Sequence, residues 1–315
     1  MSDLLQTTIN TLAVGGLYAL IALGYTLVYG ILRFINFAHS DIVSWGGWLA
    51  FTIASAAGWL ATGHSPVFAM PIVLLLTMVI CSVLGVTIER LAYRPLRKAP
   101  RLNVLITAIG VSLFLQNVGL LDRFFGNRPA TMSALLPNDV LATFGGVHLR
   151  VYDTLTIVLT VVLVLVLERV IYGTRLGRAM RAVSFDERTA GLMGINVNSI
   201  VTVTFAIGSA LAAAGGILFA LRNDLRQTAD ASWVLLGLKA FVAAVVGGIG
   251  NVRGAATGAL LIAFVEVFVH RYVTQAFPDT PWVGQLQDIY VFGILILVLL
   301  FKPSGLLGKA VVEKV

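Results

Sequence analysis

Five glycines between residues 245 and 258 are the first candidates for chemistry in this sequence. The stretch VVGGIGNVRGAATG contains Gly247, Gly248, Gly250, Gly254 and Gly258 and follows an apolar run. Glycines in this setting often form a loop that binds the phosphates of a nucleotide. A dinucleotide site, however, requires G-x-G-x-x-G, and Arg253 stands where the third glycine belongs. The alternative is helix packing, because small residues spaced four apart let membrane helices approach closely.

Other patterns that would support catalysis are missing. The four histidines have no ligand spacing, and Cys81 is the one cysteine, so no disulfide or cysteine metal site can form within the chain. The Walker A pattern G-x-x-x-x-G-K-[ST] does not occur either. We therefore expect no enzyme activity, no metal and no cofactor in this chain, and no ATP hydrolysis by the chain alone.

The composition indicates a membrane protein. Of the 315 residues, 58% are hydrophobic and only 12% are charged, and the mean hydropathy is +0.92. A soluble domain carries about 25% charged residues. Apolar runs of about 20 residues, enough to cross a hydrocarbon core about 30 Å thick, recur throughout the chain. Because these runs are continuous rather than alternating, we predict an all-α polytopic membrane protein with one transmembrane domain over 1–315, and not a β-barrel.

The candidate spans define the expected topology. They are residues 9–31, 42–61, 67–89, 102–121, 151–170, 200–221, 231–247, 254–272 and 286–301. Segment 34–61 is rich in glycine and serine and is a candidate broken or re-entrant helix, so the expected number of transmembrane helices is about eight or nine. The first Lys or Arg is Arg33, so the N-terminal stretch is expected to be a retained span rather than a cleaved signal peptide.

The basic residues are sorted to one side of these spans. Of the 22 Lys and Arg residues, 15 fall on the side of loop 172–199 and six on the side of loop 122–150, with Lys239 inside a span. The positive-inside rule then places the N-terminus outside and the C-terminus in the cytoplasm. The net charge of +7 follows from this sorting and does not indicate nucleic acid binding. Two related halves meeting near 122–150 are a further expectation, since each has a polar, glycine-bearing segment near a membrane face.

The inside loop 172–199 is the most informative segment. Its centre, about 176–190, predicts one short amphipathic helix that bears Arg178 and Arg181, with Asp186 and Glu187 following this basic stretch. Gly191 and Gly194 are expected to end the helix and turn the chain. Two interpretations stay open. The segment is either a solvated basic loop or a docking helix for a cytosolic partner, which would couple that partner mechanically to the neighbouring spans.

Polar residues inside the predicted spans are the remaining candidates. Asn36, His39 and Asp41 follow the first span and either cap a turn where a helix restarts or line a translocation path. Lys239 and Glu266 lie in consecutive antiparallel spans and either form an ion pair, or Lys239 meets the carboxylate of a substrate. The pairs Glu89–Arg90 and Glu168–Arg169, and the five tryptophans, are expected to be anchors at the membrane interface.

Three segments together resemble permease subunits of ABC importers for branched-chain amino acids. They are GLYALIALGYTLVYGILRFINFAHSD (16–41), TRLGRAMRAVSFDERTAGLMGIN (174–196) and GLKAFVAAVVGGIGNVRGAATGALLIAFVE (237–266), and the resemblance extends over nearly the whole chain. One departure is Ser40, where the family usually has glycine after the histidine. The resemblance implies that 172–199 is a cytoplasmic coupling loop. Its residues Arg178, Arg181, Asp186, Glu187, Gly191 and Gly194 would take part in coupling.

The resemblance also implies a function and partners. The chain would be the transmembrane pore subunit of an ATP-driven importer of branched-chain or related small amino acids in the bacterial inner membrane, working by alternating access. Its partners would be a second, similar permease, two cytosolic ATPases that use the ATP, and a soluble extracytoplasmic substrate-binding protein. Alternatives are a permease of the same family for urea or short amides, and a stand-alone channel or secondary transporter.

Overall fold

The computed structural model shows a helical bundle with one small hairpin, and it describes residues 2–60, 66, 68–97, 99–130, 132, 135, 136, 139–223, 229, 232–277 and 286–308. The helices are α1 (Ser2–Leu32), α2 (His39–Ala56), α3 (Ala69–Ile88), α4 (Arg101–Gly119), α5 (Val151–Gly173), α6 (Arg175–Phe185), α7 (Glu187–Leu192), α8 (Val197–Asn223), α9 (Ser232–Gly247), α10 (Val252–Ala276) and α11 (Gln287–Phe301). Within the described residues, six helices are long and apolar enough to cross a membrane, and two shorter ones are apolar. The chain is therefore a mostly helical, polytopic membrane protein, while eight or nine crossings stays a prediction.

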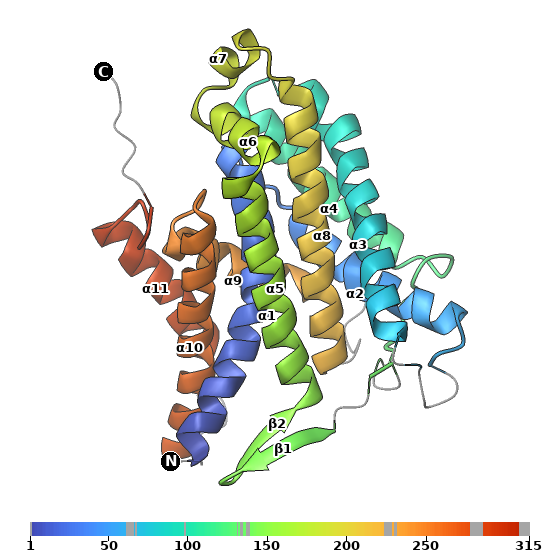
Figure 1. The fold of residues 1–315 in the computed structure, drawn as a ribbon, viewed down its shortest axis with the longest axis vertical. Coiled ribbons are helices and arrows are strands. Elements are labelled where there is room, and N and C mark those ends of the chain that lie inside the picture. Colours follow the sequence, from blue (N-terminus) through green and yellow to red (C-terminus); the bar gives the residue numbers. More distant parts are fainter. Residues whose placement is uncertain are drawn as a thin grey trace.

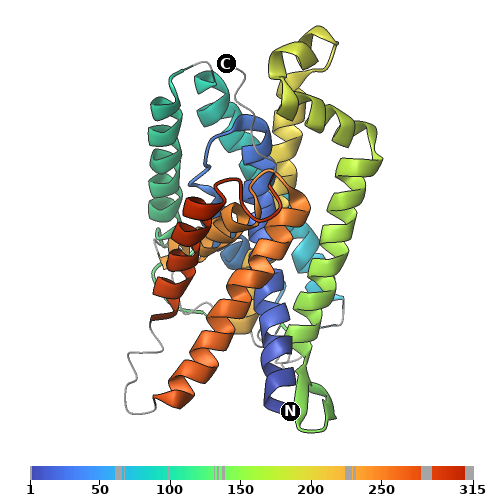
Figure 2. The same cartoon turned by 90° about the vertical axis from the view of Figure 1, so that its left-hand side faces the viewer.

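Helices α1 and α8 form the core of the bundle. In the most apolar window of each, 89% and 72% of the residues are buried, against 28% in α3 and 22% in α5. Figure 2 shows α1 lying between α10 and α5, and both helices contact it. Because α3 and α5 expose apolar side chains such as Val83 and Leu165, these outer helices present the surface expected to face lipid.

The bundle has two distinct ends (Figure 1). Helices α6 and α7 lie at one end, and the start of α1 lies at the other, beside the strands β1 (Val140–Phe144) and β2 (Val147–Arg150). The antiparallel strands are joined at Gly145 and Gly146, whose φ angles of 54° and 85° fit a tight hairpin turn. This hairpin within the loop 122–150 was not predicted, and the rest of the described chain is mostly helical.

The chain is broken between α1 and α2. His39, the first residue of α2, contacts the carbonyl oxygen of Ile21 at 3.2 Å through Nε2, although α1 continues to Leu32. The eleven residues of α1 that follow Ile21, up to its end at Leu32, measure about 16 Å along the helix. The start of α2 therefore lies beside α1 about 16 Å before α1 ends. The non-helical segment 33–38 therefore runs beside α1 inside the bundle, as expected for a broken helix.

Helices α8 to α11 repeat the order of α1 to α4 in the opposite direction. The first helix of each set is long, with 31 and 27 residues, and the second is short, with 18 and 16 residues. In Figure 1, α1 starts at the hairpin end and α8 starts at the α7 end. These lengths and directions fit an inverted repeat, and the repeat stays a prediction. In this repeat α5, α6 and α7 would lie between the two halves, which were expected to meet near 122–150.

Candidate functional site

The exposed element at the α7 end consists of two helices instead of the single predicted helix over 176–190. Asp186 is extended, with φ −153° and ψ 107°, and its carboxylate accepts hydrogen bonds from the backbone N–H groups of Arg188 and Thr189 at 2.9 and 3.2 Å. The Thr189 side chain also donates to this carboxylate, which lowers the pKa of Asp186. Asp186 therefore ends α6 and caps α7, and this N-cap competes with a continuous helix.

The two glycines that follow have different roles. Gly191 lies inside α7, whereas Gly194 has a φ of 84° and its N–H donates to the Gly191 carbonyl at 3.1 Å. Only Gly194 therefore turns the chain, and the prediction that Gly191 ends the helix is wrong.

The outer face of α6 and α7 mixes charge with apolar side chains. Arg178, Arg181 and Glu187 are exposed there. Beside them Phe185, Leu192 and Met193 are 86%, 82% and 79% exposed. The inner face packs through a small cluster of Met180, Val183, Ala190 and Ile200. An exposed apolar group ringed by charges is typical of a protein-binding surface.

Contacts connect this surface to the core of the bundle. Ser184 of α6 donates through its hydroxyl to the Gly30 carbonyl of α1, and Arg33 donates to the Ser184 carbonyl at 3.4 Å. Arg33 has a φ of 52°, which is uncommon for a residue other than glycine. A displacement of α6 would therefore act directly on the end of α1 and on the broken segment after it.

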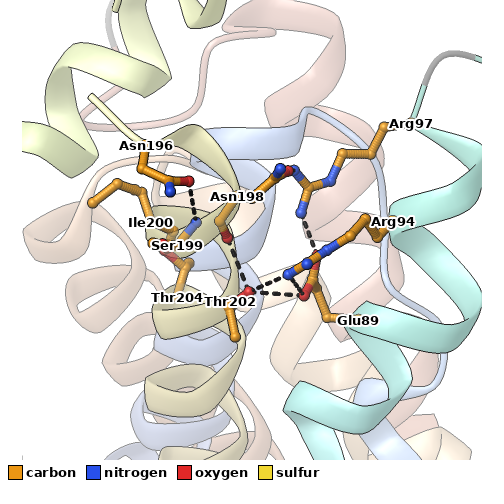
Figure 3. A network of polar contacts seen from close by, with 9 residues as sticks. All are labelled: Glu89, Arg94, Arg97, Asn196, Asn198, Ser199, Ile200, Thr202 and Thr204. Carbon is orange, nitrogen blue, oxygen red and sulfur yellow. Dashed lines mark hydrogen bonds and ion pairs between the residues drawn. The ribbon is translucent and has the colours of Figure 1, made fainter. Parts of the chain in front are cut away.

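A second connection is the buried carboxylate of Glu89 (Figure 3). Its side chain is fully buried at the end of α3 and is paired with Arg94 at 2.9 Å and with Arg97. The Thr202 hydroxyl of α8 donates to the same carboxylate at 2.9 Å. Glu89 was expected to be an anchor at the membrane interface, and this is wrong, because two guanidinium groups and a hydroxyl compensate its burial. The network ties α3 to the start of α8, directly after α7.

Asn36, His39 and Asp41 are all buried, but they contact three different elements. Asn36 accepts a hydrogen bond from the hydroxyl of Tyr93 at 2.6 Å, and Asp41 accepts one from the Gln116 amide of α4 at 3.0 Å. His39 contacts α1, as described above. The first turn of α2 has no side-chain cap hydrogen bond, so the interpretation of these residues as a capped turn is wrong. They fix the broken segment against its neighbours.

Lys239 and Glu266 form an ion pair inside the bundle. The ammonium group of Lys239 is 2.9 Å from a carboxylate oxygen of Glu266 and 2.7 Å from Asp288 of α11. Tyr18 of α1 donates to the other Glu266 oxygen at 2.7 Å. The structure therefore confirms the ion pair and adds two partners that the sequence did not indicate.

The glycines around 250 pack helices and turn the chain. A Cβ atom at Gly247 of α9 would overlap the backbone of Gly254, and one at Gly258 would overlap the backbone of Ala243. Gly248 and Gly250 lie in the turn between α9 and α10 with φ angles of 111° and 92°. Gly250 is therefore not part of a helical stripe as predicted, because Asn251 caps α10 after it. The glycine that packs against Gly254 of α10 is Gly247 of α9 instead.

Comparison with known proteins identifies the family. Residues 7–300 match the model of a family described as branched-chain amino acid transport system / permease component. The chain is 40% identical to the high-affinity branched-chain amino acid transport system permease protein BraD of Pseudomonas aeruginosa, over 99% of this chain and 98% of BraD. It is 36% identical to LivH of Escherichia coli, a permease protein described in the same words, over 99% of this chain and 97% of LivH. The chain belongs to this permease family.

A further pair of relatives comes from one archaeon. This chain is 28% identical to the protein of Methanocaldococcus jannaschii named "Probable branched-chain amino acid transport permease protein LivH", over 93% of this chain and 89% of LivH. It is also 26% identical to LivM of the same organism, over 75% of this chain and 69% of LivM. One organism therefore has two different permeases similar to this one.

Several expected anchors of the permease are buried instead. Trp48 and Trp233 are each 1% exposed, and the indole N–H of Trp45 donates to the carbonyl of Leu115 at 3.1 Å. Trp282 lies outside the described residues. Glu168 pairs with Arg253 near the end of the bundle that carries α6, so of the two expected acidic anchors only Glu168 stays near the surface.

Replacing Glu89 by glutamine tests whether the α3–α8 network stabilises the permease. We expect Glu89→Gln to lower the free energy of unfolding by about 1–3 kcal/mol, because Arg94 and Arg97 lose their charged acceptor. The measurement is thermal unfolding of the detergent-purified permease. Arg90→Gln changes the adjacent exposed residue and is expected to leave the unfolding temperature unchanged. Equal effects of both substitutions would contradict the role given to Glu89.

Proposed function

We propose that this permease is the pore subunit of an ATP-driven importer that carries branched-chain or related small amino acids across the inner membrane by alternating access. The observation that carries the proposal is the exposed α6–α7 surface together with its two connections to the helices around the broken segment. A rigid-body movement of α6 and α7 would shift α1 through Ser184 and α3 through α8 and Glu89. Both connections lead toward segment 33–38, the part of the bundle best placed to open or close a path.

The distribution of charge in the structure supports one orientation of the permease in the membrane. At the α7 end (Figure 1), the end of α3 is followed by Arg94 and Arg97, α6 contains Arg178 and Arg181, and α10 begins with Val252 and Arg253. At the hairpin end, β2 ends at Arg150, and the last turns of α8 and α10 contain Arg222 and Arg271. Under the positive-inside rule the α7 end faces the cytoplasm. This supports the proposal that the N-terminus lies outside and the C-terminus in the cytoplasm. The α6–α7 surface is then available to cytosolic ATPases, and Lys98, Arg226, Lys309 and Lys314 lie outside the described residues.

The partners follow from the family and from the missing chemistry. Two cytosolic ATPases would use ATP, since the sequence has no Walker A pattern, and no cofactor or nucleic acid is expected at this chain. A second, similar permease would complete the pore, as suggested by the similarity to both LivH and LivM of one archaeon. A soluble extracytoplasmic protein would deliver the substrate. Urea or short amides remain the alternative substrates, whereas the relatives named above are described as branched-chain amino acid permeases.

Asp186 provides the test of the docking surface. We expect Asp186→Ala to reduce co-purification of the ATPases and ATP-driven uptake several-fold, because α7 loses its N-cap. Asp186→Asn keeps a capping side chain and is expected to retain both. Since the pKa of Asp186 is lowered, the carboxylate that caps α7 stays charged at neutral pH. It loses its charge only in acid. Docking through α6 and α7 is contradicted if Asp186→Ala and Gly191→Leu both leave ATPase association and uptake unchanged.

A further inference from the structure

A polar cavity opens among the helix ends opposite α6 and α7. It has a volume of about 390 Å³ and lies between the start of α1, the end of α8, the end of α10 and the start of α11. Its charged lining is Asp3, Arg222, Glu266 and Arg271, and its apolar lining is Val14 and Val267. The side chains of Thr7 and His270 and three amide side chains complete it. The cavity therefore combines charge of both signs with an apolar wall.

The anionic wall of the cavity carries an excess of negative charge. Glu266 is 13% exposed and accepts from Lys239 and Tyr18, as described above, while Lys239 also pairs with Asp288. One ammonium group therefore serves two carboxylates. Because the partly buried carboxylates exceed their cation by one charge, a further cation in the cavity would be stabilised.

The cationic wall is the guanidinium group of Arg222. It is partly exposed and pairs with Asp153 of α5 through one nitrogen, Nη1. A guanidinium group has five N–H donors in a fixed fork that matches a carboxylate. Arg222 and Asp153 also line a second cavity of about 480 Å³, which shares Asp3, Gln6 and Asn10 with the first and opens beside the hairpin. Arg222 thus lies at the junction of the two cavities, with donors left for another carboxylate.

From this arrangement we propose that the cavity is a low-affinity site for a zwitterionic α-amino acid with an apolar side chain. The α-ammonium group would meet Glu266, the α-carboxylate would meet Arg222, and the side chain would lie toward Val14 and Val267. The affinity for the amino acid stays low, because Arg222 already pairs with Asp153 and Glu266 already pairs with Lys239. Weak binding permits onward release of the amino acid. The assignment rests on the proposed function and adds a substrate site in the permease itself, at the end proposed to face outward.

Thiol labelling tests this site in the complete transporter. The single cysteine, Cys81, is buried, so Cys81→Ala gives a background for Asn10→Cys, at a position that lines both cavities. A membrane-impermeant thiol reagent is applied from outside with and without L-leucine. With leucine at about four times its Kd, occupancy slows labelling about fivefold. Leu141→Cys, exposed on β1 and outside both cavities, is the matched control and is expected to label at an unchanged rate.

Analogues that lack one charge distinguish a zwitterion site from simple apolar binding. 4-Methylpentanoate lacks the ammonium group and 3-methylbutylamine lacks the carboxylate, so neither is expected to slow labelling at the leucine concentration. In the Arg222→Gln variant, the protection of Asn10→Cys by leucine is expected to fall to the level seen with 3-methylbutylamine. Equal protection by all three compounds, or none by leucine, overturns the site.

Leucine uptake with the partner subunits is measured in the same vesicles. Uptake without protection overturns only this site, whereas no leucine uptake overturns the proposed function.

Discussion

Replacing Gly247 by alanine is expected to lower the free energy of unfolding by about 3 kcal/mol, the upper end of the usual cost of overpacking. The added methyl group would overlap the carbonyl oxygen of Gly254, which is backbone and cannot rotate away. Helices α9 and α10 would have to separate, and the turn at Gly248 and Gly250 would move with them. The measurement is thermal unfolding of the purified permease.

Gly110→Ala is the control for this substitution. Gly110 lies in α4, and a Cβ atom there would have no neighbour within 4 Å. Alanine is favoured over glycine within a helix by about 0.5–1 kcal/mol, so this variant should be as stable as the parent or slightly more stable. If Gly247→Ala behaved like Gly110→Ala, close packing of α9 on α10 would be refuted.

Replacing Lys239 by methionine is the second substitution with a large expected effect. It leaves the carboxylates of Glu266 and Asp288 without their cation, and breaking a buried pair in this way costs about 3–5 kcal/mol. Adding Glu266→Gln should recover part of the loss, because the two changes are coupled. Both variants are compared with the parent by thermal unfolding in detergent.

An exposed pair gives the contrast for Lys239. Arg271 lies 3.6 Å from Asp3, and their side chains are 51% and 75% exposed. Exposed pairs contribute about 0–1 kcal/mol, so Arg271→Met should change the unfolding temperature little. A loss in Arg271→Met as large as in Lys239→Met would mean that the Lys239 cluster is not a stabilising core.

The sequence predicted most of the helices, because an apolar run of nearly the length of a membrane span is a local property. The same holds for the exposed segment 172–199, whose charge and glycines are visible in one stretch. Asp186 was misplaced within it, because whether an aspartate continues a helix or caps the next one depends on competing hydrogen bonds. The two-residue glycine turn at 145 and 146 was the missed local signal for the hairpin.

The polar networks could not be predicted, because their partners are distant in sequence. Glu89 accepts from Thr202, 113 residues away, and Lys239 reaches Asp288 in the last helix. A charged residue near a span end indicates an interfacial anchor unless such a partner is known. The burial of Trp48 and Trp233 has the same origin, since α2 packs against α8 and α9 packs against α1, which are distant in sequence.

ATP-dependent leucine uptake by the reconstituted transporter tests the central claim most directly. The permease is placed in vesicles with its partner permease, the two ATPases and the binding protein, and radiolabelled L-leucine is supplied outside. We predict accumulation that requires ATP and all four kinds of subunit, and that is lost when the permease is omitted. Leucine transport by this chain alone without ATP, or no leucine transport by the complete assembly, would contradict the account.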